Sequence, residues 1–361
     1  MSNQTKTRLL PAREQGREPT SEDQEPPMYE HGVNTPASQE DGSSFPEDIA
    51  DALEVEEIDV DLYRSKSLWR PARARGVFGG QVIAQGTAAA NKTVRQGVFL
   101  HCYFLLAGDQ TVPILYQVER VRDGGSYVTR SVKATQRGKS IFTIILSYQR
   151  PEPNQPRFQI PVPTLDSSGS TMTASSAKDR IKNLPGPEES PLNEARYEKV
   201  LDREPNLDPK LRSILQSWVN DRKKSPVEIR DALPGMYDSK GMPTPGDQQA
   251  FWLRTRKPVQ GGIEAQKVAL AYASDFYLLS TVTKALENSR TIKMMASLDH
   301  SMWFYDSFDV NDWLLFVMQT QGASNGRGVA MGRIYRKDGT LVAVVAQEGM
   351  VRGKEAKSSK I

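Results

Sequence analysis

The stretch A-Q-K-V-A-L-A-Y-A-S-D-F-Y-L-L-S, residues 265–280, decides the fold class because it predicts a helix that is apolar on nearly every side. A helix of this kind must be covered by other elements, and a sheet that wraps around it does so most completely. Asp275 lies in the middle of the predicted helix, where no turn offers it a solvated polar stripe. A buried, unpaired carboxylate costs several kcal/mol. We therefore expect Asp275 to be either paired or used in chemistry.

The sequence holds two copies of one pattern, each a long apolar helix followed by antiparallel strands and Gly-rich turns. In the first copy the helix is predicted at 78–93, with strands at 112–121, 126–135 and 140–149. The third strand is expected to be buried on both faces. Adding 200 to each number aligns the strands of the second copy without a gap and places Phe104 on Phe304. The shared order of elements indicates an internal repeat.

Composition divides the chain into five segments. The first is rich in Glu, Pro, Gln, Ser and Gly, which is typical of a disordered arm. Between the two copies lies a connection that opens with P-E-P-N-Q-P and carries one or two surface helices, and the second copy then begins with strands at 226–230 and 249–254. The expected segments are an arm (1–50), a first copy (51–150), a linker (151–225), a second copy (226–353) and a flexible tail (354–361).

Charge and composition exclude several classes of function. The 47 basic and 44 acidic residues are dispersed, so nothing indicates a nucleic-acid surface. No run approaches 18 apolar residues, so no membrane span is expected. A single cysteine, Cys102, and only three histidines leave little for a disulfide framework, a metal site or a histidine-based triad. We expect neither a metal nor another cofactor.

The sequence ends in Ser359-Lys360-Ile361, a conservative variant of the S-K-L address that the peroxisomal import receptor reads. The tripeptide stands at the end of K-E-A-K-S-S-K-I, a stretch suited to an exposed, flexible tail. We expect a peroxisomal matrix location and the import receptor as a partner.

Three segments resemble the signatures of the TesB-type acyl-CoA thioesterases, a double-hotdog family that includes peroxisomal enzymes. They are R-G-V-F-G-G-Q-V-I-A-Q (75–85), A-S-L-D-H-S-M-W-F (296–304) and A-Q-E-G-M-V-R (346–352). The resemblance covers roughly residues 55–352, except most of the linker. It implies an α+β fold, a tandem double hotdog in which each long helix is wrapped by a curved antiparallel sheet. It also implies hydrolysis of fatty acyl-CoA to a free fatty acid and CoA.

The resemblance further implies that Asp275, Ser297 and Gln347 jointly hold the water that attacks the thioester. A desolvated aspartate is a stronger base than an exposed one, because burial raises its pKa. A hydroxyl and an amide can each donate and accept, which suits them to fixing a water. The helix of the first copy contains no Asp or Glu, so we expect one active site per chain.

Other residues are weaker candidates for contacts with the acyl-CoA substrate. Backbone N–H groups at Gly79 and Gly80 could stabilise an oxyanion at the start of a helix. His300 could be a substrate contact or a packed strand residue, and Arg327 could meet a CoA phosphate or be solvated. Asp275 itself could be a satisfied core carboxylate, and Gln347 could be structural.

Two alternative functions stay open from the sequence. One is a non-catalytic acyl-CoA binding module, although the presence of Asp, Ser and Gln favours turnover. The other is a hotdog enoyl-CoA hydratase or dehydratase, but the predicted helices contain no His to act with an Asp. Chain-length preference and the residues that bind the CoA phosphates do not follow from the sequence. The chain could also pair into a homo-oligomer through its sheets.

Overall fold

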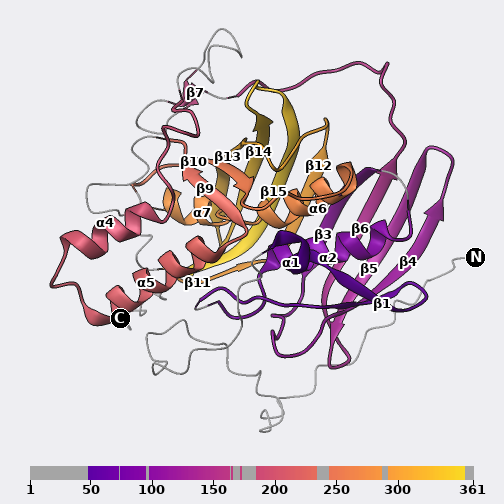
Figure 1. Cartoon of the computed structure of the whole chain (residues 1–361), viewed down its shortest axis with the longest axis horizontal. Helices are drawn as coiled ribbons and strands as arrows, with labels where there is room; N and C mark the ends of the chain where they lie inside the picture. Colours follow the sequence, from indigo (N-terminus) through magenta and orange to yellow (C-terminus); the bar gives the residue numbers. More distant parts are fainter. Residues whose placement is uncertain are drawn as a thin grey trace, which may run out of the picture. The chain divides into compact units, whose positions relative to one another are not determined.

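Two helices, α2 (Gly79–Asn91) and α6 (Ile263–Ala273), lie side by side in the computed structural model, against an antiparallel sheet (Figure 1). Most residues of both helices are buried, as their apolar sequences require. The residues that the structure describes all belong to one compact unit. The structure describes residues 48–72, 74–94, 97–162, 164–165, 171–172, 184–233, 244–286 and 292–353.

The first copy consists of a short helix, two short strands, the long helix α2 and four longer strands. The strands alternate buried and exposed side chains, which is the pattern of a sheet with one face on the core. Its elements are α1 (Ile49–Leu53), β1 (Val55–Asp59), β2 (Leu62–Ser65), α2, β3 (Gly97–Phe104), β4 (Leu115–Asp123), β5 (Tyr127–Gln136) and β6 (Lys139–Gln149).

The second copy repeats this order, with β14 displaced from β5 by the expected 200 residues. The opening strands expected at 226–230 and 249–254 are found as its first two strands. Its elements are β9 (Val227–Asp231), β10 (Gln248–Thr255), α6, α7 (Ser280–Ala285), β11 (Ile292–Ser297), β12 (Asp299–Phe304), β13 (Leu314–Ser324), β14 (Arg327–Arg336) and β15 (Leu341–Gly353).

A single sheet runs through both copies. Its path is β1-β2-β4-β5-β6-β3-β12-β15-β14-β13-β10-β9, with β11 paired to β15 beside it. The two halves join where β3 pairs antiparallel with β12. Ser301 there lies opposite His101, and the numbers of these two residues differ by the 200-residue offset of the repeat. The expected α+β architecture, with two long apolar helices that are each wrapped by antiparallel strands, is confirmed.

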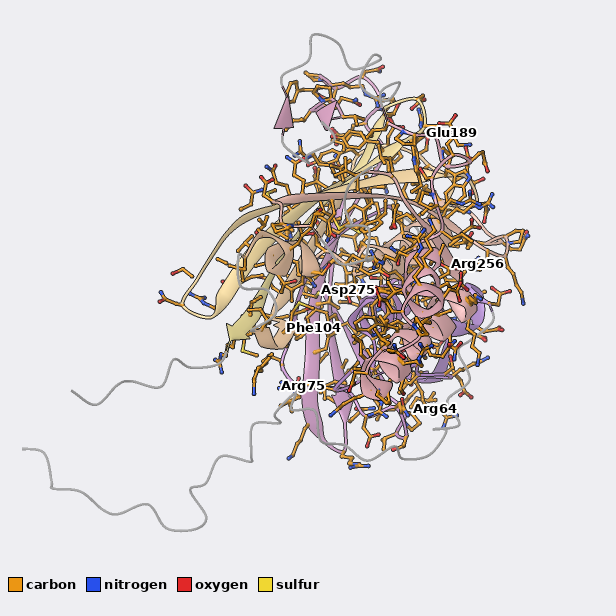
Figure 2. All side chains as sticks on the ribbon, turned by 90° about the vertical axis from the view of Figure 1, so that its left-hand side faces the viewer. Arg64, Arg75, Phe104, Glu189, Arg256 and Asp275 are labelled. Atoms are coloured by element: carbon orange, nitrogen blue, oxygen red, sulfur yellow. The ribbon has the colours of Figure 1, made fainter. Side chains whose placement is uncertain are left out.

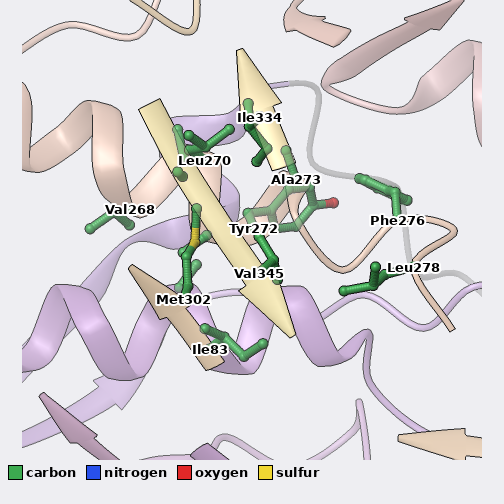
Figure 3. Packing of buried hydrophobic residues seen from close by; sticks show 14 of the residues in the cluster. Ile83, Val268, Leu270, Tyr272, Ala273, Phe276, Leu278, Met302, Ile334 and Val345 are labelled. Carbon is green, nitrogen blue, oxygen red and sulfur yellow. The ribbon is translucent and has the colours of Figure 1, made fainter. Parts of the chain in front are cut away.

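The core fills the space between the helices and this sheet. Leu270 and Tyr272 of α6 pack near Val345 of β15 and Met302 of β12, and Ile83 of α2 reaches the same cluster (Figure 3). Because α2 is built of Ala, Gly and other small residues, α6 can lie close against it. The contact between the two helices is therefore part of one continuous hydrophobic core.

The segment between the copies contributes to this core as well as to the surface. It contains the two-residue strands β7 (Thr164–Leu165) and β8 (Thr171–Met172) and the helices α4 (Ala195–Arg203) and α5 (Pro209–Lys224). The Arg222 guanidinium of α5 is buried and lies 4.7 Å from the centre of the Phe276 ring. Asp221 accepts a hydrogen bond of 2.8 Å from the N–H of Ala72. The segment thus carries two helices, and α5 also packs against the residues that follow α6.

The helix predicted over 265–280 is wrong in its second half. α6 ends at Ala273, and Asp275 lies in the turn beyond it rather than in mid-helix. The Ser274 hydroxyl donates to the carbonyl of Ala271, a local bond that competes with helix propagation. Tyr277 then adopts a left-handed conformation with φ of 64°, which breaks the helix. The Tyr277 hydroxyl donates to Asn193 of the inter-copy segment, so a distant part of the chain holds this turn.

Two smaller expectations also differ from the structure. Strand β6 alternates instead of being buried on both faces, and Ile145 is 47% exposed. Helix α1 begins at Ile49, which is buried and lies within the range expected for the arm, and Asp48 caps this helix. The tripeptide Ser359-Lys360-Ile361 and nearly all of the arm lie outside the described residues. No helix among the described residues is long and apolar enough to cross a bilayer.

The close approach of the two helices gives a test of stability. A Cβ at Gly80 would stand 2.4 Å from the carbonyl oxygen of Tyr272, whereas one at Gly86 in the same helix would have its nearest neighbour at 3.4 Å. We expect Gly80→Ala to lower the free energy of unfolding by about 1–3 kcal/mol. Gly86→Ala should raise it by up to about 1 kcal/mol through helix propensity. Urea unfolding of both variants measures the difference, and equal effects would contradict this packing.

Candidate active site

Asp275 connects the two copies directly. It follows the end of α6, and its Oδ2 atom accepts a hydrogen bond of 2.8 Å from the N–H of Gly80, at the start of α2. The first N–H groups of a helix have no partner within the helix, and its positive end favours a carboxylate. The amino terminus of α2 therefore stabilises the charge that the second copy supplies.

Gly79 and Gly80 make this approach possible. A Cβ at Gly79 would lie 2.8 Å from Asp275 Oδ2, and one at Gly80 would collide with the backbone of Tyr272. Side chains at these positions would push the carboxylate and α6 away from the helix start. The N–H of Gly80 is already used by Asp275, whereas the N–H of Gly79 has no acceptor among the described residues.

Gln347 joins Asp275 to Ser297. Its Nε2 atom donates to Asp275 Oδ1 at 2.8 Å and to Ser297 Oγ at 2.9 Å. An ionised carboxylate only accepts, so the amide nitrogen must face Asp275 and this orientation of the side chain is fixed. The other amide atom, Oε1, is buried and has no hydrogen-bond partner among the described residues. Hydrogen bonds thus join the three predicted residues, and the Oε1 atom of Gln347 beside them is an acceptor without a partner among the described residues.

Strand pairing places Ser297 and Gln347 together. β15 pairs with β11 at one end, where Ser297 lies opposite Gly349, and with β12 further along. The chain turns between β11 and β12 at Leu298, whose N–H donates to the carbonyl of Glu348. Gln347 therefore lies next to the point where its two partner strands divide, and this brings the Ser297 hydroxyl within reach of its amide.

Burial controls the chemistry of the carboxyl group. Desolvation raises the pKa of Asp275 above the usual range, while the hydrogen bonds from Gln347 and Gly80 act in the opposite direction. A raised pKa makes the ionised carboxylate a better proton acceptor than an exposed one. The hydrogen bonds keep that ionised form accessible, because both neighbours are donors.

The remaining predicted residues have other surroundings. His300 is fully buried, and its Nε2 atom lies 3.0 Å from the Ser274 hydroxyl. Arg327 is exposed and forms an ion pair of 3.2 Å with Glu348, the residue after Gln347. Exposed ion pairs of this kind contribute little to stability. The structure places His300 beside the trio but out of contact with solvent, and Arg327 at the surface.

One aromatic residue at the site was not singled out in the sequence. The ring of Phe104, from β3 of the first copy, comes within 3.1 Å of the point where a Gly79 Cβ would stand. Asp275 Oδ2 is 2.8 Å from that same point, and the two side chains lie near one another in Figure 2. The only signal in the sequence was the alignment of Phe104 with Phe304, which does not indicate a site.

The carboxyl-terminal ends of α2 and α6 carry different polar side chains. At the end of α2 the polar side chain is Asn91, whose Oδ1 accepts from the hydroxyl of Tyr148. A neutral amide there cannot act as the base that a carboxylate provides. Within the described ranges, no three His, Cys, Asp or Glu side chains are grouped to hold a metal ion.

Family models match both copies. Residues 67–149 match the acyl-CoA thioesterase N-terminal domain, and residues 215–351 match the acyl-CoA thioesterase C-terminal domain. The boundary between the two matches falls in the segment that contains α4 and α5, which agrees with the division of the sheet into two halves.

Whole-chain relatives agree with these models. Acyl-coenzyme A thioesterase 8 of Rattus norvegicus is 36% identical over 310 residues, covering 85% of this chain and 89% of the relative. The peroxisomal acyl-coenzyme A thioester hydrolase 1 of Saccharomyces cerevisiae is 24% identical, in a match that covers 78% of this chain and 87% of the relative. The crystal structure of acyl-CoA thioesterase II TesB2 from Mycobacterium marinum is similar to this structure with a TM-score of 0.61 and 30% sequence identity. The match covers 85% of this chain and 99% of the TesB2 chain. The chain belongs to the TesB-type acyl-CoA thioesterase family.

Proposed function

We propose that the protein hydrolyses fatty acyl-CoA through a water that Asp275, Ser297 and Gln347 hold. The observation that carries this proposal is the bridge made by the Gln347 amide, which binds Asp275 and Ser297 and presents its own buried Oε1 atom. A water that donates one hydrogen to Asp275 and the other to Gln347 Oε1 would have a lone pair free for attack. The Ser297 hydroxyl would help to fix the same water.

The reaction then needs no covalent intermediate on the protein. The water oxygen forms a bond to the thioester carbonyl carbon while Asp275 takes the proton. The carbon–sulfur bond breaks when the tetrahedral intermediate collapses, and the CoA sulfur leaves with the proton from Asp275. The products are a fatty acid and CoA, and the carboxylate is regenerated.

The amino terminus of α2 supplies the donor for the oxyanion. Gly80 N–H is engaged by Asp275, so Gly79 N–H is the candidate, at the positive end of the helix. A backbone donor aimed at the developing charge contributes strongly in a site that excludes water. In this proposal the second copy provides the base, and the first copy (51–150) provides the oxyanion donor and one wall of the acyl site.

We also propose a peroxisomal location. The Saccharomyces cerevisiae relative, which is named a peroxisomal acyl-coenzyme A thioester hydrolase and matches over 78% of this chain, supports it. The tripeptide Ser359-Lys360-Ile361 is the expected signal for the import receptor.

Replacing the base tests the mechanism. We expect Asp275→Asn to lower kcat for palmitoyl-CoA by roughly 10²–10⁴-fold, because an amide cannot take the proton. Release of the CoA thiol, followed with a thiol reagent, measures the rate. The matched control is Glu264→Gln, which also alters a partly buried carboxyl group with a raised pKa, but one in the first turn of α6, at the opposite end of that helix from Asp275. Equal rates for wild type and Asp275→Asn would end the assignment, and binding without turnover in the wild type would favour a binding module.

The pH dependence follows from the raised pKa of Asp275. The base acts only when ionised, so kcat/KM should fall as the pH drops through the raised pKa. This acid limb should lie above the ordinary aspartate value of about 3.9. A pH profile of kcat/KM checks the position of the limb. A rate that stays constant down to about pH 4 would show that the base is not a desolvated carboxyl.

Phe104 is expected to limit the bulk of the acyl group near the reacting carbon, because its ring borders Gly79 and Asp275. We expect Phe104→Ala to raise kcat/KM for a 2-methyl-branched acyl-CoA, relative to the straight-chain substrate, by roughly tenfold, since one methyl group in an apolar site is worth about 1–3 kcal/mol. Phe304→Ala removes the aligned ring of the second copy and is the matched control. The same change in both variants would point to a general loss of packing.

A further inference from the structure

A buried hydrogen bond joins the residue before Asp275 to the strand that follows Ser297. The Ser274 hydroxyl lies 3.0 Å from His300 Nε2 and also donates to the carbonyl of Ala271 at 2.9 Å. Neither Ser274 nor His300 is exposed to solvent. With the one hydrogen of the Ser274 hydroxyl given to Ala271, the ring nitrogen is the donor to Ser274. This assigns the proton of neutral His300 to Nε2.

His300 has the properties of a structural donor rather than of an acid or a base. Burial lowers the pKa of His300 to about 3, so the ring is neutral at physiological pH. Its Nδ1 atom is buried and has no hydrogen-bond partner among the described residues. A neutral ring that solvent cannot reach does not exchange protons with a substrate. Any effect of His300 on the reaction must therefore pass through Ser274.

The position of this bond determines what it restrains. Ser274 is covalently joined to Asp275, and His300 lies three residues beyond Ser297 on the far side of the Leu298 turn. His300 itself is held from the first copy, because it lies opposite Cys102 in the β3–β12 pair and its carbonyl accepts from the Cys102 thiol at 3.2 Å. The bond thus connects the turn that carries the base to the strands that carry its partners.

We propose that His300 is a positioning residue, which acts through Ser274 to hold the Asp275 turn at hydrogen-bonding distance from Gln347 and Ser297. This inference rests on the proposed function of those three residues. Asp275 follows a helix end and precedes the left-handed Tyr277, so its backbone is not fixed by regular secondary structure. A shift of about 1 Å in a catalytic group can cost about 10²-fold in rate.

Four variants test the proposal in the full-length protein. His300→Leu removes the donor, His300→Gln places an amide Nε2 near the position of the ring nitrogen, and Ser274→Ala removes the acceptor. The fourth variant combines Ser274→Ala with His300→Leu. Thr87→Val is the matched control, because Thr87 is a buried residue of α2 whose hydroxyl bonds to the carbonyl of Ile83, as that of Ser274 bonds to Ala271, but not to His300.

We expect His300→Leu and Ser274→Ala each to lower kcat for palmitoyl-CoA by about 10- to 100-fold, with KM changed by less than about threefold. The double variant should lose no more than either single variant, because both remove the same bond. His300→Gln should recover most of kcat. Thr87→Val should keep the wild-type kcat, whatever its effect on the unfolding midpoint.

Equal losses in His300→Gln and His300→Leu, additive losses in the double variant, or a kcat unchanged in Ser274→Ala would overturn the positioning role. If His300→Leu does not fold, the comparison of Ser274→Ala with Thr87→Val still decides. Asp275→Asn distinguishes the two proposals. Full activity of Asp275→Asn would contradict the proposed function itself. Loss of activity in Asp275→Asn together with wild-type activity in Ser274→Ala would contradict only the role of His300.

Discussion

The structure depends on how a buried carboxylate is stabilised. Asp275 can be ionised in the core because Gly80 N–H and the Gln347 amide both donate to it, one from each half of the chain. Without both donors, desolvation would keep the group protonated or expel it from the core. The two glycines of α2, the end of α6 and the position of β15 all serve this one requirement. The fold and the chemistry therefore share the same contacts.

The surrounding framework makes the arrangement rigid. The sheet continues from one half to the other through β3 and β12, and residues on both sides of that junction border the site. The inter-copy segment adds two further contacts, with Asn193 on Tyr277 and Arg222 over Phe276. Residues on either side of Asp275 are thus held by Arg222 of α5, by Asn193 ahead of α4 and by His300 of β12. The proposed catalytic groups, set on such a support, would need little reorganisation during the reaction.

Periodicity in the sequence predicted the elements well, because apolar helices and alternating strands follow from burial alone. The family resemblance supplied Asp275, Ser297 and Gln347, and the structure brings these three together. The end of α6 was mispredicted, since it depends on Ser274 and on Asn193, which is 84 residues from Tyr277. The contact of Asp275 with Gly80 spans 195 residues, and Phe104 reaches the site through the junction of β3 with β12, where its N–H donates to the carbonyl of Leu298. No local pattern encodes contacts of that range.

The different side chains at the ends of α2 and α6 have a consequence for which substitutions such a protein can accept. In a symmetric dimer, every substitution appears twice, so one sequence must serve as both the base-bearing and the donor-bearing subunit. Fusion into one chain removes that obligation. Here Asn91 ends one helix, and the carboxylate follows only the other. Each copy is free to specialise, and residues of the proposed acyl wall can be altered without any matching change around the proposed base.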